Sequence, residues 1–375
     1  MNSFWENDSF FAPQDVIIIG SGVAGLWCAV ELKKKNKKLK ITILERGIIP
    51  TGASTRNAGF ACFGSPGELL YDKQLFGEDE MLNIVEMRYK GIDKIKQNFD
   101  SDTIGFDSCG GFEVYEQSSF KNKNYNYFLD EVADLNNSLS SITKTKTTFL
   151  DTSENIAAKG LQGFSNMIEN KLEGSLHSGK YIMALTQLAQ SLGVQIITGI
   201  TVTGWQKINA AITVNTNQQI NFSTSQLIVC TNAFTNNLIK DVVTPGRGQI
   251  ILTSPVKNFK LKGTFHFNEG YYYFRNVGDR ILLGGARNLA FADETSTEII
   301  NTTPITSHLK AFIRKHILPE ADYTIEHEWS GIMGFTQDKK PVVKKMGPNV
   351  TLALACNGMG VALSPVIAEK IAAGF

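Results

Sequence analysis

The sequence VIIIGSGVAG at residues 16–25 decides the fold class, together with the residues that follow it. A run of apolar residues is typical of a parallel strand that is buried on both faces. Gly20, Gly22 and Gly25 then permit a tight turn, a close approach of the backbone to a pyrophosphate, and close packing of a helix. A helix-like stretch and a second apolar strand follow within residues 26–44. The order strand, glycine turn, helix and strand predicts a Rossmann-type domain.

A carboxylate completes this pattern. Glu45 ends the second predicted strand, about 20 residues after Gly25, where an acidic side chain accepts hydrogen bonds from ribose hydroxyls. A 2'-phosphate would be repelled at this position. The helix N-terminus faces the phosphates, because its N–H groups and its dipole favour anions. We therefore predict a dinucleotide site.

The loop that follows distinguishes between two cofactors. Residues 51–60 read TGASTRNAGF, a run of small residues with Arg56 and Asn57 among them. Backbone N–H groups in such a loop can run along the phosphates and the ring system of a cofactor. A nicotinamide enzyme would not need this loop, so it favours FAD. The alternative is a plain surface loop.

Composition limits the classes of partner. The chain has 375 residues, enough for about two domains. Lys and Arg number 37 against 36 Asp and Glu, so the net charge of +1 favours a small-molecule partner and not nucleic acid. The five cysteines are scattered and form no C-x-x-C pair, which argues against disulfides and zinc. We find neither a signal sequence nor an apolar run that could span a membrane, and we expect a cytoplasmic protein without bound metal.

Later motifs extend the pattern over the whole chain. They are HSGKY at 177–181, ITV at 200–202, LIVCTNA at 227–233, WSG at 329–331, TQDKKP at 336–341 and NGMGVALSP at 357–365. The order of these motifs is specific, although each is modest alone. With them, the chain resembles the D-amino acid oxidase family of flavoproteins, in the branch of glycine oxidase, sarcosine oxidase and gamma-glutamylputrescine oxidase.

The motif and the resemblance together predict the FAD contacts. Gly358 and Gly360 precede an apolar stretch at 361–373 that predicts a helix, and its positive end would stabilise charge on the reduced flavin. The predicted cofactor residues are Gly20, Ser21, Gly22, Val23, Ala24, Gly25, Glu45, Arg46, Ser54, Arg56, Asn57, Ala58, Gly59, Phe60, Val202, Thr231, Asn232, Ala233, Gly331, Gly358, Met359, Gly360, Val361 and Ala362.

We predict an α/β fold, α+β overall, with a Rossmann-type FAD-binding domain and a discontinuous substrate domain built on a mostly antiparallel β-sheet. The β signals of the substrate domain are strongest at 264–267, 270–275 and 280–285, with a Gly-Asp turn before the last. By resemblance, substrate lies between that sheet and the flavin ring. The predicted FAD-binding domain comprises 12–68, 171–239 and 326–375, and the substrate domain 69–170 and 240–325.

One strand carries the candidate substrate residues. In the sequence YYYFR at 271–275, alternation places Tyr271, Tyr273 and Arg275 on one face. A guanidinium beside two phenols could bind a carboxylate through its planar fork. The alternative is an aromatic stripe in the core of a sheet, with Arg275 paired to a structural acid. Arg287 is a second candidate cation, for which a structural role is favoured.

The chain departs from its relatives at several positions. Glycine oxidases carry carboxylate-binding arginines where Met333 and Gly358 align, so glycine is disfavoured as the substrate. Sarcosine oxidases attach flavin to a cysteine near the position of Gly331, and its absence here implies non-covalent FAD. They also carry an oxygen-activating lysine where Leu282 aligns, so oxygen or another electron acceptor is possible. The ending at 357–363 looks closer to the gamma-glutamylputrescine oxidase branch, which favours an amine with a distant acidic group.

The expected reaction is hydride transfer from the carbon that bears a neutral amine to flavin N5, giving an imine that water hydrolyses. The cofactor carries this chemistry, so no separate nucleophile is needed. His266 lies in a predicted substrate-domain strand and is a minor candidate for proton transfer. One alternative is the oxidation of a hydroxy acid or polyol, which would need a general base. The other is a non-catalytic flavin-binding protein.

Overall fold

The computed structural model describes residues 2–120, 124–209, 211–355 and 357–375. The chain forms two compact units. Unit 1 consists of Met1–Thr55, Ser178–Gly246 and Ile332–Phe375, and unit 2 consists of Arg56–His177 and Arg247–Gly331. The first boundary between the units, between Thr55 and Arg56, falls inside the predicted cofactor loop at 51–60. Cys356 lies outside the described residues, and the other four cysteines are free thiols.

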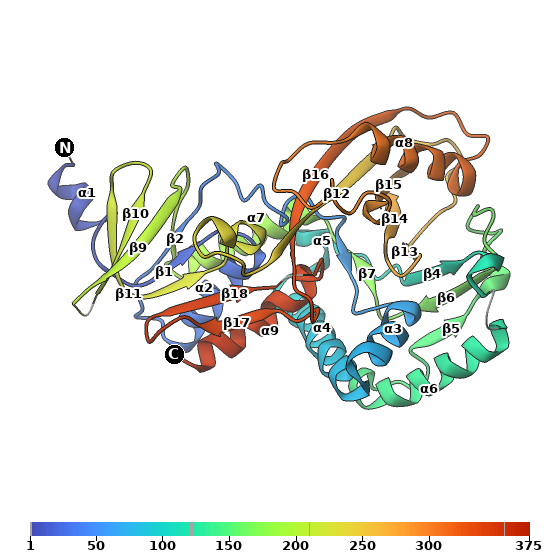
Figure 1. Ribbon diagram of the computed structural model, residues 1–375, viewed down its shortest axis with the longest axis horizontal. Coiled ribbons are helices and arrows are strands. Elements are labelled where there is room, and N and C mark those ends of the chain that lie inside the picture. Colours follow the sequence, from blue (N-terminus) through green and yellow to red (C-terminus); the bar gives the residue numbers. More distant parts are fainter. Residues whose placement is uncertain (1, 121–123, 210, 356) are drawn as a thin grey trace. The chain divides into compact units, whose positions relative to one another are not determined.

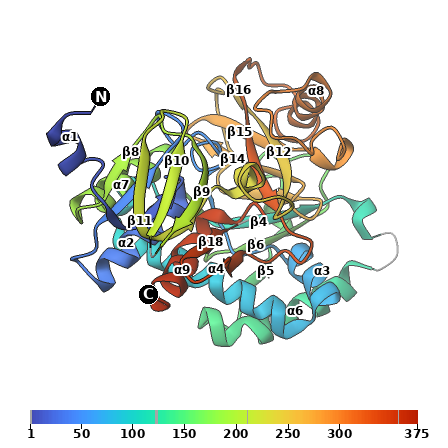
Figure 2. The ribbon, with the colours of Figure 1, turned by 60° about the vertical axis from the view of Figure 1, so that its left-hand side comes forward.

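Unit 1 is built on an eight-stranded sheet with the order β17-β18-β11-β1-β2-β8. The pairings from β18 to β8 are parallel, whereas β17 pairs antiparallel with β18. Strands β9 and β10 continue antiparallel from β11, and Figure 2 shows the three side by side. The strands are β1 (Gln14–Ile19), β2 (Ile41–Leu44), β8 (Gln195–Ile197), β9 (Val202–Ile208), β10 (Ala211–Thr216), β11 (Asn221–Val229), β17 (Val342–Lys345) and β18 (Val350–Leu354).

Packing against two other helices holds α2, the helix that follows the glycine turn, against the sheet. Helix α2 packs against α7 and α9, and Trp27 donates a hydrogen bond from Nε1 to the Tyr181 hydroxyl at 2.7 Å. Both side chains are fully buried, as are Ile17 and Ile18 of β1. The helical elements are α1 (Phe4–Asp8), α2 (Val23–Lys35), α7 (Ser178–Ser191), η3 (Asn232–Asn237) and α9 (Gly360–Ala373).

Unit 2 contains a second eight-stranded sheet, with the order β16-β12-β15-β14-β13-β4-β6-β5. Strand β13 pairs with β4 in parallel, whereas the pairings of β12 with β15, β15 with β14, β14 with β13, β4 with β6 and β6 with β5 are antiparallel. Unit 2 also contains a short antiparallel pair of strands, β3 with β7. The strands are β3 (Phe60–Ala61), β4 (Gly111–Tyr115), β5 (Phe149–Asp151), β6 (Asn166–Asn170), β7 (Gly174–Ser175), β12 (Thr244–Thr253), β13 (Thr264–Phe267), β14 (Tyr272–Val277), β15 (Arg280–Gly285) and β16 (Ile325–Phe335).

Two groups of helices in unit 2 pack near different strands of its sheet. Helices α3, α4 and α6 lie together near β5, and α8 contacts β15 (Figure 1). Tyr272 and Phe274 point into the core under α8, where Tyr272 stacks on Phe312 at a centroid distance of 4.9 Å. The helical elements are α3 (Pro66–Phe76), α4 (Glu78–Asn98), α5 (Ser101–Ile104), η1 (Gln117–Phe120), α6 (Tyr125–Thr143), η2 (Ser153–Asn155), η4 (Arg287–Leu289), α8 (Thr303–Phe312) and η5 (Ile313–Ile317).

The predicted fold class is confirmed, with one change at a strand boundary. The parallel sheet with its glycine turn and the mostly antiparallel second sheet both form. However, β14 begins at Tyr272 and not at residue 270, because Asn268, Glu269 and Gly270 all have positive φ and form a turn. Tyr271 therefore lies just outside the strand, and its ring packs partly against the core.

Candidate functional site

The predicted dinucleotide turn forms at the end of β1. Gly22 is the N-cap of α2, and the backbone N–H of Val23 donates to Ser54 Oγ at 3.0 Å. A Cβ at Gly25 would overlap the carbonyl oxygen of Gly20, so only glycine permits the helix to start this close to the strand. Glycine at these positions leaves room for a pyrophosphate at the helix N-terminus.

Glu45 holds the turn from the end of β2. Its Oε2 accepts hydrogen bonds from the backbone N–H and the hydroxyl of Ser21, at 2.9 and 3.0 Å. Its Oε1 accepts from the backbone N–H of Gly47 at 2.9 Å. A carboxylate offers about four acceptor sites, so this buried group retains capacity for a ribose hydroxyl. The glycine turn and this carboxylate fit the adenosine and pyrophosphate end of FAD.

Other predicted cofactor residues of unit 1 lie at the ends of its strands. Arg46 follows β2, and its guanidinium stacks 3.6 Å from the centre of the Phe234 ring. Val202 is the first residue of β9, and Thr231, Asn232 and Ala233 follow β11. The carboxyl ends of parallel strands, where Arg46 and residues 231–233 lie, are the usual place for ligands in such sheets, whereas Val202 lies at the amino end of an antiparallel strand.

The C-terminal glycine segment leads into α9. The backbone N–H of Asn357 donates to the Gly334 carbonyl at 2.7 Å, which holds the turn before the helix. A Cβ at Gly358 would lie 3.7 Å from the sulfur of Met333. The two positions that glycine oxidases fill with arginines are therefore neighbours here. Helix α9 begins at Gly360, so Gly360, Val361 and Ala362 form its first turn, with Met359 as the N-cap.

Unit 2 brings the remainder of the predicted loop to its sheet. Arg56 donates from Nη1 to the Ser330 carbonyl at 2.9 Å, and the Trp329 indole donates to the Arg56 carbonyl at 3.0 Å. Gly331 follows directly in β16. Asn57 accepts a hydrogen bond from the backbone N–H of Gly59 at 2.8 Å, across Ala58.

Three ring side chains form a surface that we call the aromatic face: Phe60, His266 and Tyr273. The Phe60 ring lies 5.1 Å from the His266 ring and 6.1 Å from the Tyr273 ring, both edge-on. His266 and Tyr273 are opposite each other on β13 and β14. The structure thus joins two sets of residues that were predicted separately, one for the cofactor and one for substrate.

Glycine in the neighbouring strand makes this surface possible. Gly284 of β15 is opposite Tyr273, and a Cβ at Gly284 would overlap the Tyr273 ring. The ring therefore lies flat across the backbone of β15. Burial raises the pKa of Tyr273 to about 12, so the phenol is neutral and can donate a hydrogen bond. Burial lowers the pKa of His266 to about 4.

Arg275 is more enclosed than the sequence pattern implied. Its side chain donates from Nη1 to the Gly59 carbonyl at 3.0 Å, and the residue is 8% exposed. Its Nε has no hydrogen-bond partner among the described residues. Burial lowers the pKa of Arg275 to about 10, partly offset by nearby Cys109 and Asp107. A carboxylate clamp formed by Arg275, Tyr271 and Tyr273 stays a prediction.

Sequence reasoning missed two buried carboxylates of unit 2, Glu113 and Glu173. Glu173 accepts hydrogen bonds from the backbone N–H groups of Phe63 and Gly64, at 2.7 and 3.2 Å. Glu113 accepts from the backbone N–H of Gly67 at 2.7 Å and from the Tyr115 hydroxyl at 2.5 Å. Together they hold the segment that follows β3. No local signal marks them, because an acid in a strand such as Glu113, or in a connection between strands such as Glu173, is usually expected on the solvent side.

Two classes of feature are absent from the described parts of the chain. No three His, Cys, Asp or Glu side chains in these parts are grouped so that they could hold a metal ion. Nor is any helix there both long and apolar enough to cross a membrane.

Solved structures of similar fold are enzymes of amino or imino acids by name. L-proline dehydrogenase from P. horikoshii superposes with a TM-score of 0.75 at 17% identity, covering 96% of this chain and 92% of that chain. Glycine oxidase from Geobacillus kaustophilus gives 0.71 at 16% identity, covering 96% and 94%. Iminodiacetate oxidase from Chelativorans sp. BNC1 gives 0.73 at 14% identity, covering 95% and 94%. At these identities the likeness shows the fold.

Sequence comparison identifies the family. The chain is 26% identical over 383 residues to the probable oxidoreductase OrdL of Haemophilus influenzae, covering 96% of this chain and 82% of that protein. It is 26% identical over 370 residues to the bifunctional protein ThiO/ThiG of Synechocystis, covering 95% and 51%. The profile of the family described as FAD dependent oxidoreductase matches residues 15–373. Because that match spans nearly the whole chain, and because the glycine turn and Glu45 fit FAD, this protein belongs to the DAO family of FAD dependent oxidoreductases.

Proposed function

We propose that this enzyme oxidises the C–N bond of a small amine or amino acid, giving an imine that water hydrolyses. The aromatic face carries this proposal. An amine gives up hydride only in its neutral form, and the burial that lowers the pKa of His266 on this face disfavours an ammonium there in the same way. FAD, when bound, supplies the hydride acceptor.

The state of His266 favours an amine over a hydroxy acid. Oxidation of an alcohol needs a group that removes the hydroxyl proton, and such a base works best with a pKa near the working pH. With a pKa of about 4, the His266 imidazole is neutral at pH 7 but is a weak base. A neutral amine needs no such base. Oxidation of a hydroxy acid or polyol is the alternative reaction.

The names of the solved relatives support the same substrate class. They act on L-proline, glycine, L-amino acids and iminodiacetate by name. All of these compounds carry an amine beside a carboxylate. We propose a substrate of that kind, or a related amine whose acidic group lies farther from the reacting carbon.

We further propose that FAD is bound without a covalent link. The four described cysteines are at positions 28, 62, 109 and 230, and Gly331 stands where a flavin-linked cysteine is expected from the resemblance. Acid precipitation should release intact FAD into the supernatant. Yellow colour that stays with the precipitate would contradict this part of the proposal. We also propose a cytoplasmic location, consistent with these free thiols.

Anaerobic reduction of the flavin tests the reaction. Purified holoenzyme is mixed in a stopped-flow instrument with amines, with L- and D-amino acids, with N-methyl amino acids and with matching hydroxy acids. Amines or amino acids should remove the oxidised flavin absorbance. Reduction by hydroxy acids alone would favour the alternative reaction, and reduction by no compound would favour a non-catalytic flavin protein.

Reoxidation of the reduced flavin, the second half of the same experiment, tests which electron acceptor the enzyme uses. Leu282 lies in β15 opposite Arg275 and is buried, so no lysine is present at this position to activate oxygen. We propose that the reduced enzyme reacts slowly with oxygen and passes its electrons to another acceptor. Mixing the reduced enzyme with air and with an artificial quinone gives the two rates directly.

A further inference from the structure

We propose that Glu113 takes up, through His266, the proton that the ammonium group of a substrate loses when it binds at the aromatic face. The inference rests on the proposed function and adds a residue to it. An aliphatic amine has a pKa of about 10 and arrives as the ammonium ion, whereas hydride can leave only from the neutral amine. The proton must therefore pass to an acceptor before the reaction, and a buried carboxylate lies in the strand next to the face.

Glu113 belongs to a row of polar side chains that crosses three neighbouring strands. It is opposite His266 in the parallel pair of β4 and β13, and His266 is opposite Tyr273 in the antiparallel pair of β13 and β14. Residues that are opposite each other in neighbouring strands have side chains on the same face of the sheet. The alternate residues Phe265 and Phe274 stack in the core on the other face. The row therefore leads from Glu113 to the aromatic face.

The Glu113 carboxylate is buried, and no ion pair joins it to a cation among the described residues. The residue is 2% exposed. Its Oε2 accepts from the Gly67 N–H and the Tyr115 hydroxyl at 2.7 and 2.5 Å, and the Ser65 side chain donates a further hydrogen bond. A carboxylate offers about four acceptor sites, so a place remains for a proton. Burial without a cation favours the protonated form.

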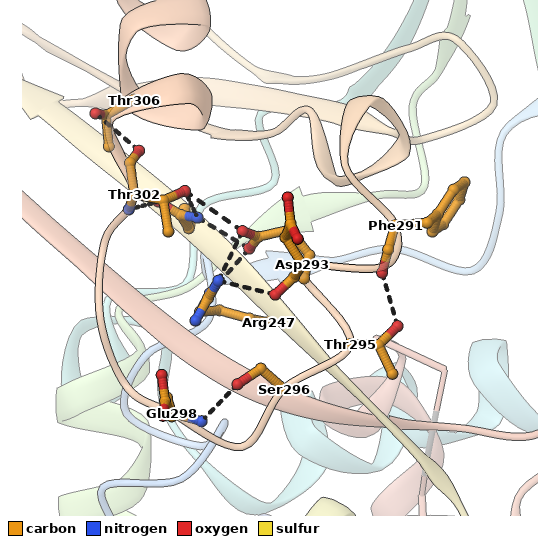
Figure 3. A network of polar contacts seen from close by, with 10 residues as sticks. Arg247, Phe291, Asp293, Thr295, Ser296, Glu298, Thr302 and Thr306 are labelled. Atoms are coloured by element: carbon orange, nitrogen blue, oxygen red, sulfur yellow. Dashed lines mark hydrogen bonds and ion pairs between the residues drawn. The ribbon is translucent and has the colours of Figure 1, made fainter.

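Another buried carboxylate of unit 2, Glu294, has the opposite arrangement. Figure 3 shows the network around Arg247, in which Glu294 accepts from Arg247 Nε and Nη2 at 3.0 and 2.8 Å, and from Gln249 Nε2 at 2.9 Å. Burial alone would raise the pKa of Glu294, but its bonds to Arg247 hold that pKa below its usual value. Burial raises the pKa of Glu113 to about 7. Glu294 is thus fixed as an anion, whereas Glu113 can gain and lose a proton near neutral pH.

The groups packed around Glu113 leave it able to change its charge. Glu68 of α3 adds to the burial that raises the pKa of Glu113, and it partly offsets the burial that lowers the pKa of His266. Arg88 of α4 pairs with Glu68 at 3.0 Å, so its charge is compensated by that carboxylate. From β6, Glu113 is opposite Ile168, which is apolar. None of these described side chains fixes Glu113 as an anion.

The transfer moves one proton and leaves the electron pair on the substrate nitrogen. The N–H bond of the ammonium breaks, one ring nitrogen of His266 takes the proton, and the other ring nitrogen passes its own proton to an oxygen of Glu113. A neutral imidazole can do this because it has one donor and one acceptor nitrogen. Its pKa of about 4 means that His266 does not keep the proton. Arg287, which acts electrostatically on Tyr273, adds a positive charge that opposes an ammonium ion at the face.

Binding of amines that cannot be oxidised tests the proposal without turnover. The probes tert-butylamine and 2-aminoisobutyrate have no hydrogen on the carbon that bears nitrogen, so they have no hydride to give. Calorimetry of the FAD-loaded protein in buffers of different ionisation enthalpy counts the protons released. At about pH 8, wild type should release almost none, whereas Glu113→Gln should release about one for each amine bound. At about pH 6, Glu113 is already protonated in wild type, so both proteins should release about one.

A carboxylate on the other face of the same sheet provides the matched control. Glu169 of β6 is opposite Phe112 and follows Ile168, so Glu169→Gln should release protons as wild type does. His266→Phe keeps a ring at the aromatic face but removes the carrier, and it should behave like Glu113→Gln at about pH 8. This variant carries the test if Glu113→Gln loses FAD or melts at a lower temperature. If the probes do not bind, a pH indicator counts the proton during anaerobic reduction by the fastest amine.

The outcomes separate this proposal from the proposed function. If amines reduce the flavin but wild type and Glu113→Gln release equal numbers of protons at about pH 8, Glu113 is not the acceptor. A difference that appears in Glu173→Gln or Glu169→Gln, but not in Glu113→Gln, would overturn the assignment as well. If the probes give the expected difference but no amine reduces the flavin, the reaction is wrong and the proton acceptor stands. A protein that neither binds the probes nor is reduced by any amine would overturn both.

Discussion

Arg247 and Glu294 form a two-point ion pair inside unit 2, with side chains that are 4% and 1% exposed. A buried pair of this kind adds little over an apolar pair, but breaking it leaves one charge without compensation.

Arg247→Met should therefore destabilise the protein by about 3 to 5 kcal/mol, measured by chemical denaturation of the FAD-loaded form. The double variant Arg247→Met/Glu294→Leu is the matched control, because it removes both charges and should recover most of the loss. A single variant that unfolds at the wild-type denaturant concentration would show that the pair contributes nothing.

The two buried carboxylates that hold the segment after β3 predict a pH dependence. Burial raises the pKa of Glu113 to about 7 and that of Glu173 to about 8. The folded protein therefore binds more protons than the unfolded chain between about pH 4.5 and pH 8. Stability should be greatest at the low end of this window and fall as the pH rises through it.

Glu173→Gln isolates this effect, because the amide oxygen can still accept the hydrogen bonds from Phe63 and Gly64. The slope of unfolding free energy against pH should become smaller in the variant, with the two proteins differing most at the alkaline end. Parallel curves would mean that Glu173 does not titrate in this range. Partly exposed Glu86, which pairs with Lys90, provides the control substitution Glu86→Gln.

Replacement of Glu45 should weaken FAD binding. Glu45→Lys places a donor where the ribose requires an acceptor, and the loss of a charge-assisted hydrogen bond costs about 1.5 to 3 kcal/mol. The dissociation constant should rise by roughly tenfold or more. Glu45→Gln keeps one acceptor oxygen and should have a smaller effect. FAD titration into apoprotein measures both, and equal affinities for all three proteins would remove Glu45 from the cofactor site.

Gly284 should not tolerate a side chain, because a Cβ there overlaps the ring of Tyr273. We expect Gly284→Ala to cost about 1 to 3 kcal/mol through overpacking, and to slow flavin reduction by displacing the phenol. Gly204→Ala is the control, since nothing lies within 4 Å of a Cβ at that position. Normal reduction rates in Gly284→Ala would show that the position of Tyr273 does not matter.

The parts of the fold that could be predicted depend on neighbours in sequence. The order strand, glycine turn, helix and strand lies within residues 14–45, and its spacing is a local property. The burial of Tyr272 and Phe274 likewise follows from alternation along one strand. Neither prediction required information about residues that are distant in sequence.

Contacts between distant residues could not be predicted in the same way. Alternation places Arg275 correctly in its strand, but its partner Gly59 is 216 residues away. Nothing near Arg275 in sequence indicates that its guanidinium will donate a hydrogen bond to a backbone carbonyl. Such contacts are set by tertiary packing, which overrides local propensity.

The strand order of unit 1 also determines when each of its strands can find its partner during synthesis. Strand β1 can pair with β2 soon after both leave the ribosome, but Val16 also pairs with Gln226, and Leu227 pairs with Val350. The second stretch of unit 2 ends at Gly331, before the last stretch of unit 1 begins. We expect that the incomplete sheet of unit 1 exposes apolar residues of the nascent chain while unit 2 folds. The chain should depend on chaperones during that interval. The unit that emerges first is the one that is finished last.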